Sequence, residues 1–173
     1  MSRLRKGTGV STDVLDGVRD ILAGQLLRSR ADVRAESLLV QDLEVDSLGL
    51  IELTFAIEEK FGVEFPDLKT SAEMLLLPLP DGLARLASTP GTTTLFEFVQ
   101  GEVAHALGGA ESDAAARDRL FRSATVADVA RAVAGAVPTA LQAGTPVAEL
   151  RLADLFRLIT VGVVARYVDF LRR

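Results

Sequence analysis

The residues with the clearest chemical potential are Asp46-Ser47-Leu48, at the beginning of an acidic amphipathic segment. A serine placed where a helix begins is open to reagents, and the free N–H groups of the first helical turn favour an attached anion. The rest of the chain offers little chemistry of its own, since it has no Cys, no Trp, one His and one Tyr. We therefore expect Ser47 either to cap a helix or to accept a reactive group from elsewhere.

The composition favours a helical protein whose partners are proteins. Hydrophobic residues make up 49% of the 173 residues but aromatic residues only 5%, so Leu, Val, Ala and Ile must build the core. A net charge of −5 and a pI near 5.0 argue against nucleic acid as the main partner and favour basic proteins. The absence of cysteine excludes a disulfide framework and a thiolate metal site.

Other reactive residues give weak signals. His105 lies in a helical segment without a Ser or Cys partner, so we expect a packed or surface histidine and no catalytic residue. Asp113, Asp118 and Asp128 are too scattered to predict a metal site. The basic start of the chain is not followed by an apolar stretch, so no signal peptide is expected. The longest apolar run, 158–165, is too short to span a bilayer, and we expect a cytoplasmic protein without stable membrane insertion.

Two amphipathic helices are expected in the first third of the chain. The first starts near Asp13, capped by Ser11 or Thr12, and shows apolar residues at helical spacing for about four turns. The second runs from Ser47 to about Phe61, where Gly62 is a natural stop. Its apolar stripe consists of Leu50, Leu53, Ile57 and Phe61, with Leu48, Ile51 and Phe55 alongside.

The remainder of the chain is also predicted to be helical, with no convincing strand. Expected helices cover 94–107, a segment from a cap at Ser112 to Phe121, the segment from Thr125 to Val137, and 147–171 as one long helix. The fold class predicted from these patterns is all-α.

The first part of the chain resembles the acyl carrier proteins, the four-helix family that bears phosphopantetheine. The motif Asp46-Ser47-Leu48 follows a first-helix segment at 18–26 and precedes the acidic helix and its exit, Phe61-Gly-Val-Glu-Phe-Pro-Asp67. The tripeptide alone is a weak signal, whereas the ordered set, which covers roughly residues 12–67, is specific.

The resemblance implies a four-helix acyl-carrier-like bundle with additional helices. We expect a flexible tail at 1–10, a carrier-like domain at 11–137 with an insertion at about 68–111, and a C-terminal helical extension at 138–173 that packs on or beside it. The last helix of the family begins with Thr-Val-x-Asp, which Thr125–Val133 fits, and the competing choice begins at Thr94.

The resemblance also implies a cofactor. In this interpretation Ser47 is esterified by 4′-phosphopantetheine, which a phosphopantetheinyl transferase takes from coenzyme A. Asp46 would help to hold magnesium and the phosphates during that transfer, and Leu48 would be an apolar docking contact. The protein would be a carrier of acyl cargo as thioesters and not an enzyme.

Two further sets of residues follow from the same resemblance. The acidic face that acyl-processing enzymes with basic docking surfaces would recognise consists of Glu52, Glu58 and Glu59. The candidates for an acyl pocket are Ile51, Phe55, Ile57 and Phe61. The alternatives are an ordinary solvated face for the acidic set and simple core for the apolar set.

The function expected from the sequence is an acyl carrier protein for specialised fatty-acid or polyketide-type synthesis. One alternative is a peptidyl or aminoacyl carrier, which shares the arm and differs in its partners. The other is an unmodified carrier-like domain that acts as an interaction scaffold.

Overall fold

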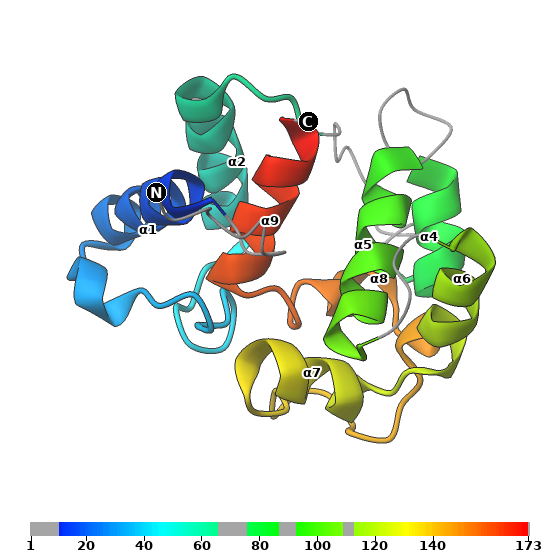
Figure 1. Ribbon diagram of the computed structural model, residues 1–173. Coiled ribbons are helices and arrows are strands. Elements are labelled where there is room, and N and C mark those ends of the chain that lie inside the picture. Colours follow the sequence, from blue (N-terminus) through cyan, green and yellow to red (C-terminus); the bar gives the residue numbers. More distant parts are fainter. Residues whose placement is uncertain (1–10, 66–75, 87–92, 109–112, 173) are drawn as a thin grey trace, which may run out of the picture.

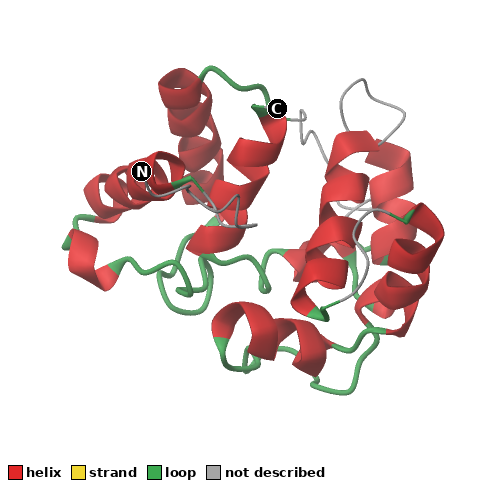
Figure 2. Cartoon of the chain, viewed as in Figure 1, coloured by secondary structure: helices red, strands yellow, loops and turns green. Residues whose placement is uncertain are grey.

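The computed structural model describes residues 11–65, 76–86, 93–108 and 113–172 (Figure 1). Within these ranges every regular element is a helix, which confirms the all-α prediction (Figure 2). The elements are α1 (Thr12–Leu26), η1 (Arg30–Asp32), α2 (Ser47–Phe61), α4 (Leu79–Leu86), α5 (Thr93–Ala106), α6 (Ala114–Ser123), α7 (Val126–Ala134), η2 (Val147–Glu149), α8 (Leu152–Leu155) and α9 (Val161–Leu171). The expected tail 1–10 and the expected cap at Ser112 lie outside the described residues.

Helices α1 and α2 confirm the two helices predicted for the first third of the chain. Helix α2 is capped by Asp46, whose Oδ1 accepts a hydrogen bond from Gly49 N at 2.7 Å. It ends at Gly62 with a φ of 65°, a left-handed conformation that glycine adopts without steric cost. Gly17 lets the two helices approach closely, because a Cβ at this position would lie 2.5 Å from Cζ of Phe61.

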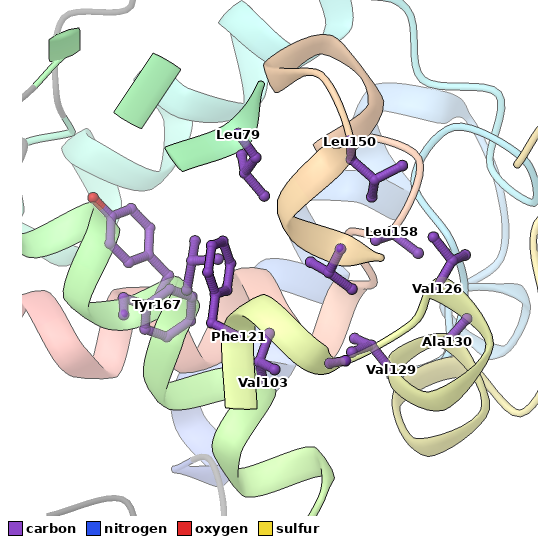
Figure 3. Packing of buried hydrophobic residues seen from close by; sticks show 13 residues of the cluster. Leu79, Val103, Phe121, Val126, Val129, Ala130, Leu150, Leu158 and Tyr167 are labelled. Atoms are coloured by element: carbon purple, nitrogen blue, oxygen red, sulfur yellow. The ribbon is translucent and has the colours of Figure 1, made fainter. Parts of the chain in front are cut away.

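Most of the buried apolar residues that the structure describes belong to two hydrophobic cores. The first core joins α1, the loop after it, α2 and α9; its members are Val14, Val18, Leu22, Val33, Leu39, Leu43, Val45, Leu53, Ile57, Val63, Val161, Ala165 and Val168. The second core joins α4 to α8 and reaches α9 through Tyr167, with Phe121 fully buried among Leu79, Val103 and Val126 (Figure 3). Within the helices, the buried members of each core lie at helical spacing on one face, and residues of the loops complete both cores.

Helix α9 belongs to both cores, and Figure 1 shows it between α1 and α2 on one side and α5 on the other. Its first face, Val161, Ala165 and Val168, is buried in the core with α1 and α2. On the other face, the ring of Tyr167 lies 4.9 Å from that of Phe98 on α5. An ion pair between Arg166 Nε and Glu102 Oε2, at 2.8 Å, adds a polar tie between α9 and α5.

Neither of the two segments that the sequence offered as the last carrier helix packs with α1 and α2. The helix that packs with α1 and α2 is α9, whereas α7, which begins after Thr125, lies in the second core with α4, α5 and α6. The competing choice, at Thr94, lies in α5 and also belongs to that second group. Of the expected extension at 138–173, α9 packs in the first core with α1 and α2, whereas η2 and α8 pack in the second core.

The single long helix predicted for 147–171 is wrong. The segment contains η2, α8 and α9, with non-helical residues between them. Thr160 caps α9, since its Oγ1 accepts a hydrogen bond from Val163 N at 3.1 Å. The backbone on either side of Thr160 bonds to the loop before α2, through Leu39 N to Ile159 O at 3.0 Å. These tertiary bonds, together with the modest helix propensity of Ile-Thr-Val, interrupt the helical pattern.

The start of α9 and the start of α7 share one arrangement, in which a helix capped by threonine is hydrogen-bonded through its backbone to a loop. Around α9, the N–H groups of Val161 and Gly162 donate to Ser37 O and Ala35 O, at 3.0 and 2.8 Å. Around α7, the matching N–H groups of 126 and 127 donate to the carbonyls of 145 and 143, at 2.8 and 2.9 Å. The sequences 125–133 and 160–168 differ only at their third, fourth and eighth positions. The second core thus repeats the local architecture of the first.

A pH-dependent contribution to stability is expected from the cap of α7. Hydrogen bonds from the Oγ1 and N of Thr125 hold the pKa of Asp128 below its ordinary value. A lowered folded-state pKa stabilises the fold above the unfolded-state pKa, and this contribution disappears as the pH falls through the folded-state pKa. In chemical unfolding, Asp128→Asn should therefore be less stable than the wild type at neutral pH. The difference should shrink below pH of about 4, and a difference that is constant with pH would contradict this assignment.

Candidate functional site

Ser47 is the first residue of α2. Asp46 occupies the N-cap position, and its carbonyl accepts the first helical hydrogen bond, from Leu50 N at 2.9 Å. The N–H groups of a first helical turn lack helical partners, and the helix dipole adds positive potential there. This end of α2 can therefore stabilise a phosphodiester attached to the serine.

The loop that leads to Ser47 is anchored in the first core. Leu39, Leu43 and Val45 are all buried, with exposed fractions of 1%, 2% and 4%. Leu43 N donates to Leu38 O at 3.1 Å and Val45 N donates to Leu39 O at 2.9 Å, so the loop folds back on itself. The serine thus follows a segment whose conformation is fixed by burial and by backbone bonds.

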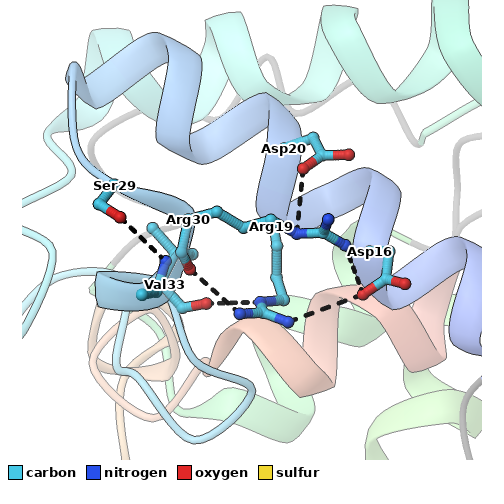
Figure 4. Close-up of polar contacts among 7 residues, drawn as sticks. Asp16, Arg19, Asp20, Ser29, Arg30 and Val33 are labelled. Carbon is cyan, nitrogen blue, oxygen red and sulfur yellow. Dashed lines mark hydrogen bonds and ion pairs between the residues drawn. The ribbon is translucent and has the colours of Figure 1, made fainter.

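Polar contacts hold the first part of this loop against α1 (Figure 4). Arg19 on α1 donates from Nε to Val33 O at 2.6 Å and from one terminal nitrogen to Arg30 O at 3.1 Å. The side chain of Arg30 returns to α1, where it pairs with Asp16 at 2.7 Å and with Asp20 at 3.1 Å. Single ion pairs that are as exposed as these contribute little to stability. The hydrogen bonds from Arg19 to backbone carbonyls, in contrast, fix the path of the chain.

The end of α1 is tied directly to the chain around Ser47. Gln25 Nε2 donates to Gly49 O, in the first turn of α2, at 2.8 Å. Arg28 donates to Asp42 O at 3.4 Å and lies 3.5 Å from a carboxylate oxygen of Glu44. Our sequence interpretation missed Gln25, although it continues the buried stripe of Val14, Val18 and Leu22 and is therefore a polar residue on an apolar face.

The four acyl-pocket candidates do not lie together. Ile57 is 1% exposed and belongs to the first core, and Phe61 is half-buried against it. Ile51 and Phe55 lie on the surface, with exposed fractions of 53% and 65%. Two of the four candidates, Ile57 and Phe61, therefore lie in or against the first core, and the other two lie on the surface, because α2 turns the face of Leu53 and Ile57 inward.

An exposed apolar stripe runs along α2 from the serine end. Leu48, Ile51 and Phe55 follow helical spacing, and Leu48 is 63% exposed. Glu52 and Glu59 are exposed on the same helix. Glu58 is half-buried, and its Oε1 accepts a hydrogen bond from Phe65 N at 2.9 Å, so it also fixes the exit from α2. We call Leu48, Ile51 and Phe55 the α2 stripe.

Other kinds of site receive no support. His105 is an exposed residue near the end of α5. Among the described residues, no group of three or more His, Asp or Glu side chains is arranged to hold a metal ion. None of the described helices has both the length and the apolar character required to cross a bilayer.

Comparison with known proteins identifies the segment around Ser47. Residues 16–69 match the family model described as the phosphopantetheine attachment site. The acyl carrier protein of Campylobacter curvus is 48% identical over 63 residues, which is 36% of this chain and 79% of that protein. The acyl carrier protein of Clostridium acetobutylicum is 43% identical over 54 residues, which is 31% of this chain and 70% of that protein. No solved structure matches the chain significantly.

Proposed function

The chain belongs to the acyl carrier protein family, and we propose that it carries acyl groups as thioesters on a 4′-phosphopantetheine arm attached to Ser47. The observation that supports this most strongly is the place of Ser47, which begins α2 within the matched segment. The terminal thiol of the arm supplies the thioester chemistry, which the chain itself lacks because it has no cysteine. Acyl carrier proteins are carriers rather than enzymes.

The residues around Ser47 fit such an arm. The helix start provides N–H groups and positive potential for the phosphodiester. Asp46 is exposed, so its second carboxylate oxygen can approach a magnesium ion while the first caps the helix. The fixed loop before Ser47 holds the attachment point still while the arm reaches partner enzymes, which raises the local concentration of cargo.

The α2 stripe and the acidic residues beside it suit partner enzymes with basic docking surfaces. Leu48, Ile51 and Phe55 offer an apolar contact, and the exposed Glu52 and Glu59 would pair with lysine or arginine of the partner. Exposed charge pairs speed and orient the encounter more than they strengthen it, which suits a carrier that must release each enzyme. Glu58 contributes less in this proposal, since its carboxylate already holds the backbone at Phe65.

We further propose that the carrier unit consists of residues 11–65 closed by α9. The core shared by α1, α2 and α9 supports this division, with α4 to α8 as an inserted second unit. The carrier would act in the cytoplasm, in a specialised fatty-acid or polyketide-type pathway.

The nature of the cargo is tested by chemical release. The protein is produced together with a phosphopantetheinyl transferase, and hydroxylamine then cleaves the thioester for mass analysis. We expect fatty or polyketide-type acyl hydroxamates. Amino-acid hydroxamates would instead establish a peptidyl carrier, and a protein that never gains the arm would refute the carrier role.

The two roles proposed for Asp46 can be separated by substitution. Asp46→Asn keeps a good N-cap, so the free energy of unfolding should stay nearly constant, whereas Asp46→Ala should lose about 1 kcal/mol. Both variants should be loaded with the arm about tenfold more slowly, because both lack the carboxylate for magnesium. A tenfold change in rate corresponds to ~1.4 kcal/mol. Unfolding curves and loading rates measure the two effects. If Asp46→Asn is loaded at the wild-type rate, Asp46 acts only as the cap of α2.

A further inference from the structure

Two residues near Ser47 hold a backbone conformation that normally favours glycine. Among the described residues, Leu27 and Glu44 are the non-glycine residues with positive φ, at 54° and 56°. In this left-handed region the Cβ of an L-residue crowds the following carbonyl, so most side chains avoid it. At the end of α1, Arg28 N donates to Ala23 O and Leu27 N donates to Gly24 O. This is the helix ending in which glycine usually takes the place that Leu27 holds.

Neither side chain offsets this strain through contacts within the fold. Leu27 is 93% exposed, more than any other large hydrophobic side chain that the structure describes, and the side chain of Glu44 is 81% exposed. A leucine in solvent buries no apolar surface, and an exposed ion pair such as Glu44 with Arg28, at 3.5 Å, adds little stability. Backbone strain that the fold does not compensate points to a role outside the fold.

Both residues belong to segments that are tied to the chain around Ser47. Leu27 lies between Gln25, which is bonded to the first turn of α2, and Arg28, which is bonded to the loop before Ser47. Glu44 lies in that loop, three residues before Ser47. Glu44 shares its loop with two more exposed carboxylates, Asp42 and Asp46, which outnumber the positive charge of Arg28 bonded to this loop. The two strained residues therefore add an exposed apolar side chain and a carboxylate to the end of the molecule that presents the serine.

We infer that Leu27 and Glu44 form a second docking patch, separate from the α2 stripe, that binds the phosphopantetheinyl transferase during loading of Ser47. The transferase is the partner that must reach Ser47 itself, and the acidic surroundings fit a basic surface on it. Leu27 would enter a small apolar pocket and Glu44 would pair with a lysine or arginine of the enzyme. This inference rests on the proposed function.

The test uses glycine at both positions, because glycine removes the side chain and the strain together. The full-length chain and the variants Leu27→Gly, Glu44→Gly and the double variant are loaded from coenzyme A by a broad-specificity transferase with magnesium. We expect each variant to have a higher melting temperature than the wild type. The kcat/KM for loading should fall several-fold for each single variant and about tenfold for the pair. A purely structural role would not raise stability while lowering the loading rate.

Two further variants sharpen the test. Leu76→Gly removes another exposed leucine, 61% exposed and outside the first core, and should load at the wild-type rate. Glu44→Lys should lower loading more than Glu44→Gly, because it repels a basic partner. Wild-type loading rates for Leu27→Gly and Glu44→Gly would overturn the inference, as would a loss of loading accompanied by a lower melting temperature. A wild-type chain that gains no arm at all would refute the proposed function and, with it, this inference.

Discussion

Ser47→Ala is expected to abolish attachment of the phosphopantetheine arm while leaving the fold intact. The hydroxyl is the atom to be esterified, so its removal should leave no residual loading rather than a slower reaction. Alanine is acceptable at the first position of a helix, and Asp46 still caps α2 through its bond to Gly49 N. The intact mass after incubation with coenzyme A, magnesium and a transferase measures this directly.

The matched control is Ser123→Ala, which removes an exposed serine from α6 in the second core region. This variant should gain the arm at the wild-type rate. A Ser47→Ala protein that still gains the mass of the arm would refute the site, and a circular dichroism spectrum unlike that of the wild type would show that the substitution acts through the fold.

Ala165→Asp is expected to unfold the carrier unit. Ala165 is 0% exposed and lies on the face of α9 that packs against α1 and α2. Burial of a polar group without a partner costs roughly 2 to 7 kcal/mol, and more for a charge, which approaches the 5 to 15 kcal/mol stability of a typical domain. Thermal unfolding should show a large drop in melting temperature, and loading at Ser47 should fall steeply because the loop before it rests on α9.

Ala132→Asp is the matched control, since Ala132 is exposed on α7. The same change there should lower the free energy of unfolding by only about 1 kcal/mol, because Asp is a poorer helix former than Ala and its charge is unfavourable in the last turn of a helix. If residues 138–173 were instead an extension beside a complete carrier, Ala165→Asp would leave loading unchanged. That result would contradict the closure of the bundle by α9.

The sequence predicted the helix that begins at Ser47 better than the architecture around it. The boundaries of α2 follow from local rules, because an Asp-Ser start, an apolar period of helical length and a glycine stop all agree. The same local rules predicted α5 and α7 closely, and Thr125 with Asp128 forms the reciprocal cap that their spacing suggests. These elements depend on residues within one or two turns of each other.

Local sequence rules could not identify α9 as the helix that packs with α1 and α2 in the first core. Residues 125–133 and 160–168 have similar sequences and both form threonine-capped helices, but only 125–128 carries the Asp of the pattern Thr-Val-x-Asp, so local rules pointed to the wrong helix. What separates them is long-range packing: Val161, Ala165 and Val168 meet α1, and the backbone beside Thr160 pairs with 35–39.

The faces of α2 illustrate a second limit of prediction from sequence. Periodicity indicated two adjacent apolar sets on this helix but could not tell which was surface, because both sets contain large apolar residues. The approach of α1 at Gly17 and the bond from Gln25 rotate Leu53 and Ile57 inward, which leaves Ile51 and Phe55 exposed. The strained Leu27 and Glu44 were equally invisible, since their backbone angles depend on how α1 ends and how the loop turns.

The measurement that tests the central claim most directly is the mass of the tryptic peptide that contains Ser47. Cleavage after Arg34 and Lys60 releases residues 35–60, which include both Ser37 and Ser47. After loading from coenzyme A by a phosphopantetheinyl transferase, this peptide should gain the mass of one phosphopantetheine arm, and its fragment ions should place the arm on Ser47. An unmodified peptide, with a known carrier modified in the same tube, or an arm on Ser37, would contradict the account.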